Sequence, residues 1–149
     1  MGLRKIMLLC SLLLSWWAGT MAQSSQGTDF WVAFMQNNDG INESEWDKYF
    51  FDLDLVLSAK RACEVQISCD SSGCFRSYSL EDNASQTVSI PFVNFNIDVY
   101  GKAIKRTLHI TSTDTISVYA ANSQFCSMEA TLILPTSACG SYYVTQTNK

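Results

Sequence analysis

The chain has 149 residues, of which 47% are hydrophobic and 16% charged, with fourteen acidic residues against ten basic ones. This length is typical of one domain with a real core. The net negative charge repels phosphate backbones, which argues against nucleic acid as a partner.

The first 22 residues have the three-part pattern of a secretory signal peptide. Arg4 and Lys5 form a basic start, Ile6–Ala18 is almost wholly apolar, and Thr20-Met21-Ala22 supplies the small residues that a signal peptidase reads. The apolar run of 13 residues is shorter than the roughly 20 residues of a membrane span. We therefore expect cleavage to leave one domain, residues 23–149, that is secreted or at the cell surface and has no transmembrane segment.

The rest of the chain alternates apolar and polar residues in short runs. A period of two with one apolar face is typical of a half-buried strand. The positions expected to face the core are, in chain order, Phe30, Val32 and Phe34; Phe51, Leu53, Leu55 and Leu57; Val65 and Ile67; Val88, Ile90 and Phe92; Leu108 and Ile110; Ile116, Val118 and Ala120; Leu132 and Leu134; and Tyr142 and Val144.

Turn residues separate these runs. They occur at 37–40, 70–73 and 81–83, and Ser112-Thr113-Asp114 is spaced as the turn of a hairpin between two strands. Short strands at this spacing predict an all-β fold, an antiparallel β-sandwich or open barrel of about eight strands.

The domain after the signal keeps five cysteines, and an odd number leaves at least one of them unpaired. Export favours structural disulfides, with buried free thiols as the alternative. Their spacing does not match the paired ligands of a zinc site, so we expect neither a metal nor a cofactor. The candidate disulfide residues are Cys63, Cys69, Cys74, Cys126 and Cys139.

The sequence gives little support to the hypothesis that the protein is an enzyme. His109 is the only histidine and lies on the polar side of a threonine-rich strand, and no G-x-S-x-G motif occurs, so a serine hydrolase is not expected. Asp52 and Asp54 share one face of a strand, which is more typical of a solvated face than of a glycosidase pair. A calcium loop with Gly40 as its sixth residue would place Met35 at the first ligand position, where it cannot coordinate calcium. We expect a protein that is not an enzyme.

Aromatic residues could form a contact face for a sugar or a protein, because they offer rigid area and a polar handle. Most of them are expected in the core, but Trp46 lies in a polar segment and is the one expected to be exposed. Trp46 and Tyr49 are therefore the predicted ligand contacts. The aromatic residues considered are Trp31, Trp46, Tyr49, Tyr119, Tyr142 and Tyr143.

Five stretches resemble the N-terminal domain of the IgGFc-binding protein family, which occurs in mucus-associated animal proteins and in exported bacterial proteins. The resemblance covers roughly residues 26–146 and corresponds to the front portion of that domain. The short signal followed by Gln23 favours an exported bacterial member. The stretches are Gln26–Phe34, His109–Ser112, Thr115–Ser123, and Ala130–Thr136 with Gly140–Val144 after it.

The resemblance mainly supports the fold and the location outside the cytoplasm. The leading hypothesis is a secreted or surface-exposed module for binding or adhesion, with a protein or a glycan as its ligand. The alternatives are a structural or assembly domain of a larger surface protein, and a truncated fragment without independent function. Export, strand alternation and resemblance together lead us to expect a non-catalytic binding module.

Overall fold

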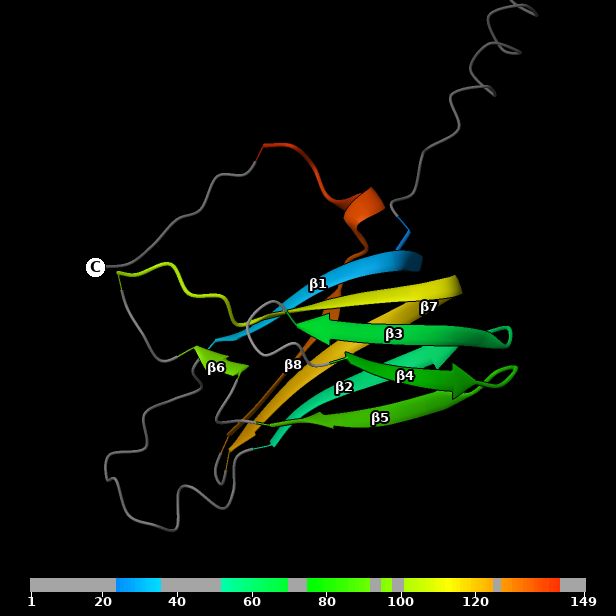
Figure 1. Ribbon diagram of the computed structural model, residues 1–149, viewed down its shortest axis with the longest axis horizontal. Coiled ribbons are helices and arrows are strands. Elements are labelled where there is room, and N and C mark those ends of the chain that lie inside the picture. The colour runs from blue at the N-terminus through cyan, green and yellow to red at the C-terminus, as the bar shows by residue number, and fades with distance from the viewer. Residues whose placement is uncertain are drawn as a thin grey trace, which may run out of the picture.

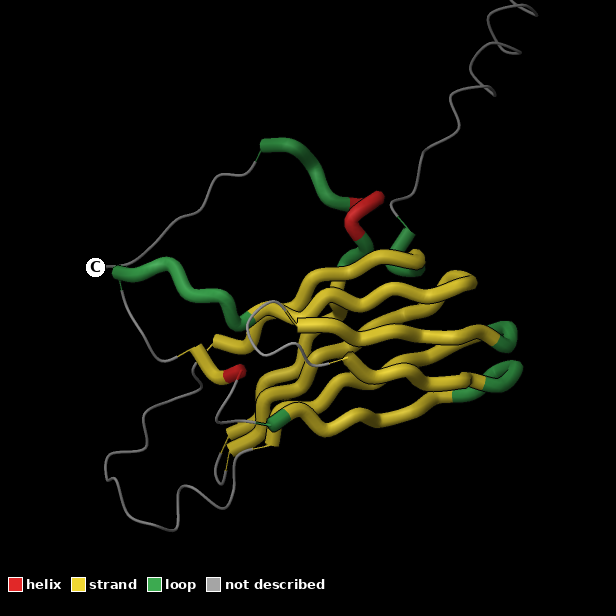
Figure 2. The backbone as a smooth tube through the Cα atoms, viewed as in Figure 1, coloured by secondary structure: helices red, strands yellow, loops and turns green. Residues whose placement is uncertain are grey.

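The computed structural model describes residues 24–35, 52–69, 75–91, 95–97, 101–124 and 127–142. They form an eight-stranded sheet that is antiparallel except for one short parallel pair, so the predicted all-β fold is confirmed (Figures 1 and 2). None of these residues belongs to a helix long and apolar enough to span a membrane. The elements are β1 (Gly27–Met35), β2 (Asp52–Ala59), β3 (Cys63–Cys69), β4 (Phe75–Leu80), β5 (Ser85–Ile90), β6 (Asn96–Ile97), β7 (Thr107–Gln124), β8 (Ser127–Ile133) and the short 3₁₀-helix η2 (Thr136–Ala138).

The long strand β7 organises the sheet into two halves. Its first part pairs with β3 and β1, and its second part pairs with β2 and β8. β4 extends the first half next to β3, and β5 extends the second half next to β2. The arrows of β2 and β3 point in opposite directions in Figure 1, and both strands are antiparallel to β7, so β7 reverses direction between its two parts. The sheet therefore curls into an open barrel.

The reversal in β7 corrects the hairpin predicted at Ser112-Thr113-Asp114. The chain does turn there, but the two parts of β7 do not pair with each other and belong to opposite halves of the sheet. The turn after β2 lies beside it, because Arg61 forms an ion pair with Asp114 at 2.8 Å and the Glu64 amide donates to Thr113 Oγ1 at 3.0 Å. These contacts hold the two crossings between the halves together.

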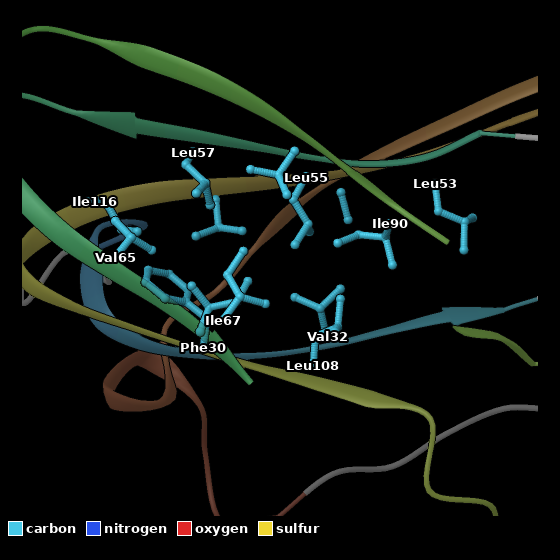
Figure 3. Close-up of a cluster of buried hydrophobic side chains, with 14 of the residues drawn as sticks. Phe30, Val32, Leu53, Leu55, Leu57, Val65, Ile67, Ile90, Leu108 and Ile116 are labelled. Carbon is cyan, nitrogen blue, oxygen red and sulfur yellow. The ribbon is translucent and has the colours of Figure 1, made fainter. Parts of the chain in front are cut away.

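The core lies between the facing halves (Figure 3). Alternation along β1, β2 and β3 buries about one side chain in two, as the sequence predicts for these strands. Phe51, Phe92 and Val144 lie outside the described residues. The fully buried larger side chains include Phe30, Leu53, Leu55, Leu57, Val65, Leu108, Ile110, Ile116 and Val118.

The sequence analysis did not predict two of the strands, β4 and β6. β4 presents mostly exposed side chains and buries only Leu80 fully, so it lacks the alternation of apolar and polar residues that predicts a strand. β6 has two residues and pairs parallel to the end of β1. A two-residue strand has no period at all, and its pairing depends on the tertiary structure.

For β8, the sequence analysis predicted the wrong side chains to face the core. Leu132 and Leu134 are exposed, and Ile133 packs against the core instead. The register explains this, because Leu132 lies opposite the exposed Tyr119 and Ile133 lies opposite the buried Val118. The final predicted strand is also wrong for Tyr142, which is 84% exposed and lies outside any strand. Consecutive apolar residues in Leu132–Leu134 left the phase ambiguous.

Candidate functional site

The candidate site is a cluster of Asp29, Trp31 and His109 on the outer face of β1 and β7. Phe30 and Val32 point into the core, so strand alternation turns the residues beside them outward. Trp31 lies directly opposite His109 in the antiparallel ladder. Residues nearly 80 positions apart in the sequence thus become neighbours.

The two rings of the cluster are stacked. The ring centroids of Trp31 and His109 are 4.2 Å apart, and the ring planes differ by 7°. His109 Nε2 donates a hydrogen bond to Asp29 Oδ2 at 2.8 Å, since a carboxylate can only accept. Trp31 is still 50% exposed, so the stack stands at the surface rather than in the core.

The helix η2 completes the cluster from the other side. Pro135, just before η2, is fully buried and packs so closely on Gly27 that a Cβ at this glycine would lie 2.4 Å from the Cβ of Pro135. This contact brings Thr136 next to Asp29. Hydrogen bonds from the His109 and Thr136 side chains hold the pKa of Asp29 below its ordinary value of 3.8, with His109 the largest cause and burial opposing it.

The lowered pKa of Asp29 predicts a pH-dependent contribution to stability. Because the pKa of Asp29 is lower in the folded state than in the unfolded state, the ionised carboxylate stabilises the fold at pH values above its unfolded-state pKa. This stabilisation is lost as the pH falls through its folded-state pKa. We expect Asp29→Asn to lower the free energy of unfolding near pH 7 by up to about 1 kcal/mol, the range of exposed pairs. The difference between variant and wild type should disappear near pH 2. Urea titrations at a series of pH values measure it, and a difference that grows toward low pH would contradict the assignment.

Among the described residues, no side-chain hydroxyl is hydrogen-bonded to the ring of His109. The hydroxyl of Ser68, across the ladder from His109, donates to the backbone oxygen of His109 at 3.5 Å and not to its ring. Asp52 and Asp54 lie on β2, in the other half of the sheet, and Asp54 accepts a hydrogen bond from Ser89 at 2.7 Å. The structure therefore does not bring His109 together with these carboxylates.

A second surface lies on the outer face of β7 and β8. Tyr119 is 45% exposed and Met128 69% exposed, and Leu132 and Leu134 are exposed on the same side. In the described part of the chain, β8 pairs only with β7. The expectation that most aromatic residues are core residues is thus wrong for Trp31, Tyr119 and Tyr142, because the core is filled by aliphatic side chains and Phe30, Phe34 and Phe95.

A groove of about 320 Å³ lies between the end of β1 and strands β7 and β8. Its lining is mainly apolar, and Glu129 is the one ionisable side chain among the described residues that line it. Asn122 crosses between the halves here, since its Nδ2 donates to the backbone oxygen of Met35 at 2.8 Å. The groove is lined by Ala33, Phe34, Met35, Ala120, Asn122, Glu129, Ala130, Thr131 and Ile133.

Two of the five candidate disulfide cysteines are free thiols, so the disulfide prediction fails for Cys63 and Cys139. Cys63 lies opposite Leu80 in the ladder of β3 and β4, so no cysteine faces it there. Cys69 is not among the free thiols, and Cys74 and Cys126 lie outside the described residues.

The two free thiols should differ strongly in reactivity. Burial, then the charges of Asp114 and Glu64, raises the pKa of Cys63, which is 6% exposed, while Cys139 is exposed. We expect iodoacetamide to modify Cys139 in the native protein more than about a hundredfold faster than Cys63, which needs an opening of the core. Peptide mass spectrometry of timed samples measures both sites, and urea should equalise them. Equal native rates would contradict the burial of Cys63.

Trp46, Tyr49 and the segment around Gly40 lie outside the described residues, so the predicted ligand contacts stay predictions. The cluster at Trp31 was missed as a site, because the register that joins it to His109 cannot be read from either strand alone. No protein-family model matches the chain, and neither a curated protein nor a solved structure is similar to it.

Proposed function

We propose that this protein is an exported, non-catalytic binding module that holds a protein or a glycan outside the cytoplasm. The observation that carries this proposal is the half-exposed Trp31, fixed on a rigid strand by its stack on His109. An aromatic ring held in one orientation loses little entropy on binding, which is why such residues dominate contact surfaces.

The arrangement of the cluster favours binding over catalysis. A general base needs a nucleophile or a substrate proton within reach of its ring nitrogen. In the described cluster the Nε2 of His109 is bonded to Asp29, and no hydroxyl or thiol among the described residues is hydrogen-bonded to the other ring nitrogen, Nδ1. These polar groups therefore orient one another and hold the indole ring in place.

The test is a binding screen with the exported protein immobilised through an added tag. Mucin, immunoglobulin G, and polysaccharide from the surface of the producing cells serve as soluble ligands in surface plasmon resonance. We expect saturable binding to at least one of them, while heat-denatured protein serves as the control. No saturable binding to any of the three would contradict the proposed function.

The second candidate function is assembly into a larger surface structure, and the observation that favours it is the apolar outer face of β8. Among the described residues one edge of β8 has no partner strand, and such an edge beside the exposed Met128, Leu132 and Leu134 is a surface that proteins usually cover. Light scattering after size exclusion tests it. A concentration-dependent oligomer that Leu132→Glu dissociates supports assembly, and a monomer at all concentrations contradicts it.

We also propose membership of the IgGFc-binding family and export by the signal segment. Support for the family comes from three of the resembling stretches, which meet at one place: Gly27 packs on Pro135, Asp29 accepts a hydrogen bond from His109, and Thr136 lies beside Asp29. Distant motifs that form one contact cluster are what a shared domain fold would require. Recovery of the protein outside the cytoplasm with Gln23 at its N-terminus tests export, and an intact cytoplasmic precursor would contradict it.

A further inference from the structure

We propose that the outward ring face of Trp31 is a stacking platform for a pyranose ring, with the Asp29 carboxylate accepting hydrogen bonds from the sugar hydroxyls. The inference rests on the proposed binding function and names the class of ligand for it. It assigns a glycan, rather than an apolar peptide, to the outer face of β1.

The geometry of the stack shows which ring face is available. Trp31 and His109 are cross-strand neighbours, and their parallel rings are 4.2 Å apart, close to the spacing of adjacent strands. The rings therefore stand upright on the sheet, and one face of the indole is covered by His109. The other face points away from β7, toward an edge where, among the described residues, β1 pairs only through Phe34 and Met35 with β6.

The platform is held in place before any ligand arrives. The indole rests on His109, His109 donates a hydrogen bond to Asp29 at 2.8 Å, and the Thr136 side chain lies beside Asp29. Pro135 anchors Thr136 through its packing on Gly27. Since the side chains are already ordered, stacking a sugar costs little conformational entropy.

The chemistry around the ring suits a sugar. A pyranose has a face of C–H groups that packs on an aromatic ring and a rim of hydroxyls that need donors and acceptors. The residues beside the stack on β7 and β3 are polar: Thr111 and Gln66 lie in one row of the ladder, and Ser68 lies across from His109, while Ala33 and Met35 follow Trp31 on the outer face of β1. With one exposed ring and Met35 as its large apolar side chains, the outer face of β1 offers an apolar peptide less area than the face with Tyr119, Met128 and Leu132.

A cationic ligand is the main competitor, because ammonium groups also bind over indole rings. Strong cation sites combine several rings or uncompensated carboxylates around the charge. Here one ring stands beside a carboxylate that already accepts a hydrogen bond from His109 and has the Thr136 side chain next to it. The observations therefore favour a neutral ligand rich in hydroxyls.

The experiment is a titration of the ¹⁵N-labelled exported protein, followed through the indole N–H signal of Trp31. Chitohexaose, cellohexaose and released mucin O-glycans are the sugar probes, and a lysine-rich peptide is the cationic probe. We expect saturable shifts with at least one sugar. Trp31→Ala should weaken binding about tenfold or more, as for a residue that supplies most of the contact, and Trp31→Phe should weaken it less.

Tyr119→Ala is the matched control, since it removes another half-exposed aromatic residue from the other half of the sheet. It should leave the sugar affinity unchanged, and circular dichroism confirms that each variant is folded. The proposal is overturned if no sugar shifts the Trp31 signal, if the two alanine variants weaken binding equally, or if only the lysine-rich peptide binds. If Trp31→Ala still binds a ligand of the surface plasmon resonance screen as wild type does, the sugar assignment fails while the binding function stands.

Discussion

Leu55→Ala should lower the free energy of unfolding by about 2–5 kcal/mol, the range for a large core side chain replaced by alanine. Leu55 is fully buried in the middle of β2, opposite Val88 on β5 and Ala120 on β7 (Figure 3). β2 is paired with β5 on one side and with β7 on the other, so its backbone has little freedom to move into the cavity that the smaller side chain would leave. Urea unfolding followed by circular dichroism measures the loss.

Val56→Ala is the control for this substitution. Val56 is the next residue of the same strand, and its side chain lies half-buried on the outer face, opposite Thr87 and Tyr119. Val56→Ala should lower the free energy of unfolding by less than about 1 kcal/mol, because truncating a partly exposed side chain loses less transfer free energy and leaves no cavity. Equal effects at the two positions would show that β2 does not divide into a buried and an exposed face.

The alternation tested by this pair is also the part of the fold that the sequence could predict. Phe30, Val32, Leu53 and Leu57 are buried as the period of two requires. The reversal within β7 could not be predicted, because turn residues such as Ser112-Thr113-Asp114 are the same for a hairpin and for a crossing between layers. The choice depends on which strands pair with each part of β7, and those are far away in the sequence.

The candidate site was less predictable than the fold for the same reason. His109 was correctly expected on the polar face of a strand, but nothing in its neighbourhood names Trp31 or Asp29 as its partners. Aromatic residues were expected in the core because of their size, yet the outward phase of β1 exposes Trp31. Because Phe30 and Val32 face the core, Trp31 must face outward, and an outward Trp indicates a contact with a side chain on the neighbouring strand.

Gly27→Ala should destabilise the protein by about 1–3 kcal/mol, the cost of overpacking a tight contact. The added Cβ would lie 2.4 Å from the Cβ of Pro135 and 3.0 Å from its Cγ, and Pro135 is fully buried. Neither group is the flexible end of a side chain, so β1 and the segment before η2 must move apart. We expect this movement to weaken the contact between Thr136 and Asp29 as well, so that Asp29→Asn costs less in the Gly27→Ala background.

Two further variants separate a steric clash from a general loss of glycine. Gly140→Ala should change the free energy of unfolding by less than about 0.5 kcal/mol, because its nearest neighbours, two backbone atoms of Tyr142, would be 3.9 and 4.0 Å from the new Cβ. Pro135→Gly removes the Cβ that Gly27→Ala would strike, so the double variant should lose less stability than the two single variants together. Strict additivity would mean that Gly27 and Pro135 do not touch, and the cluster that joins β1, β7 and η2 would then need another explanation.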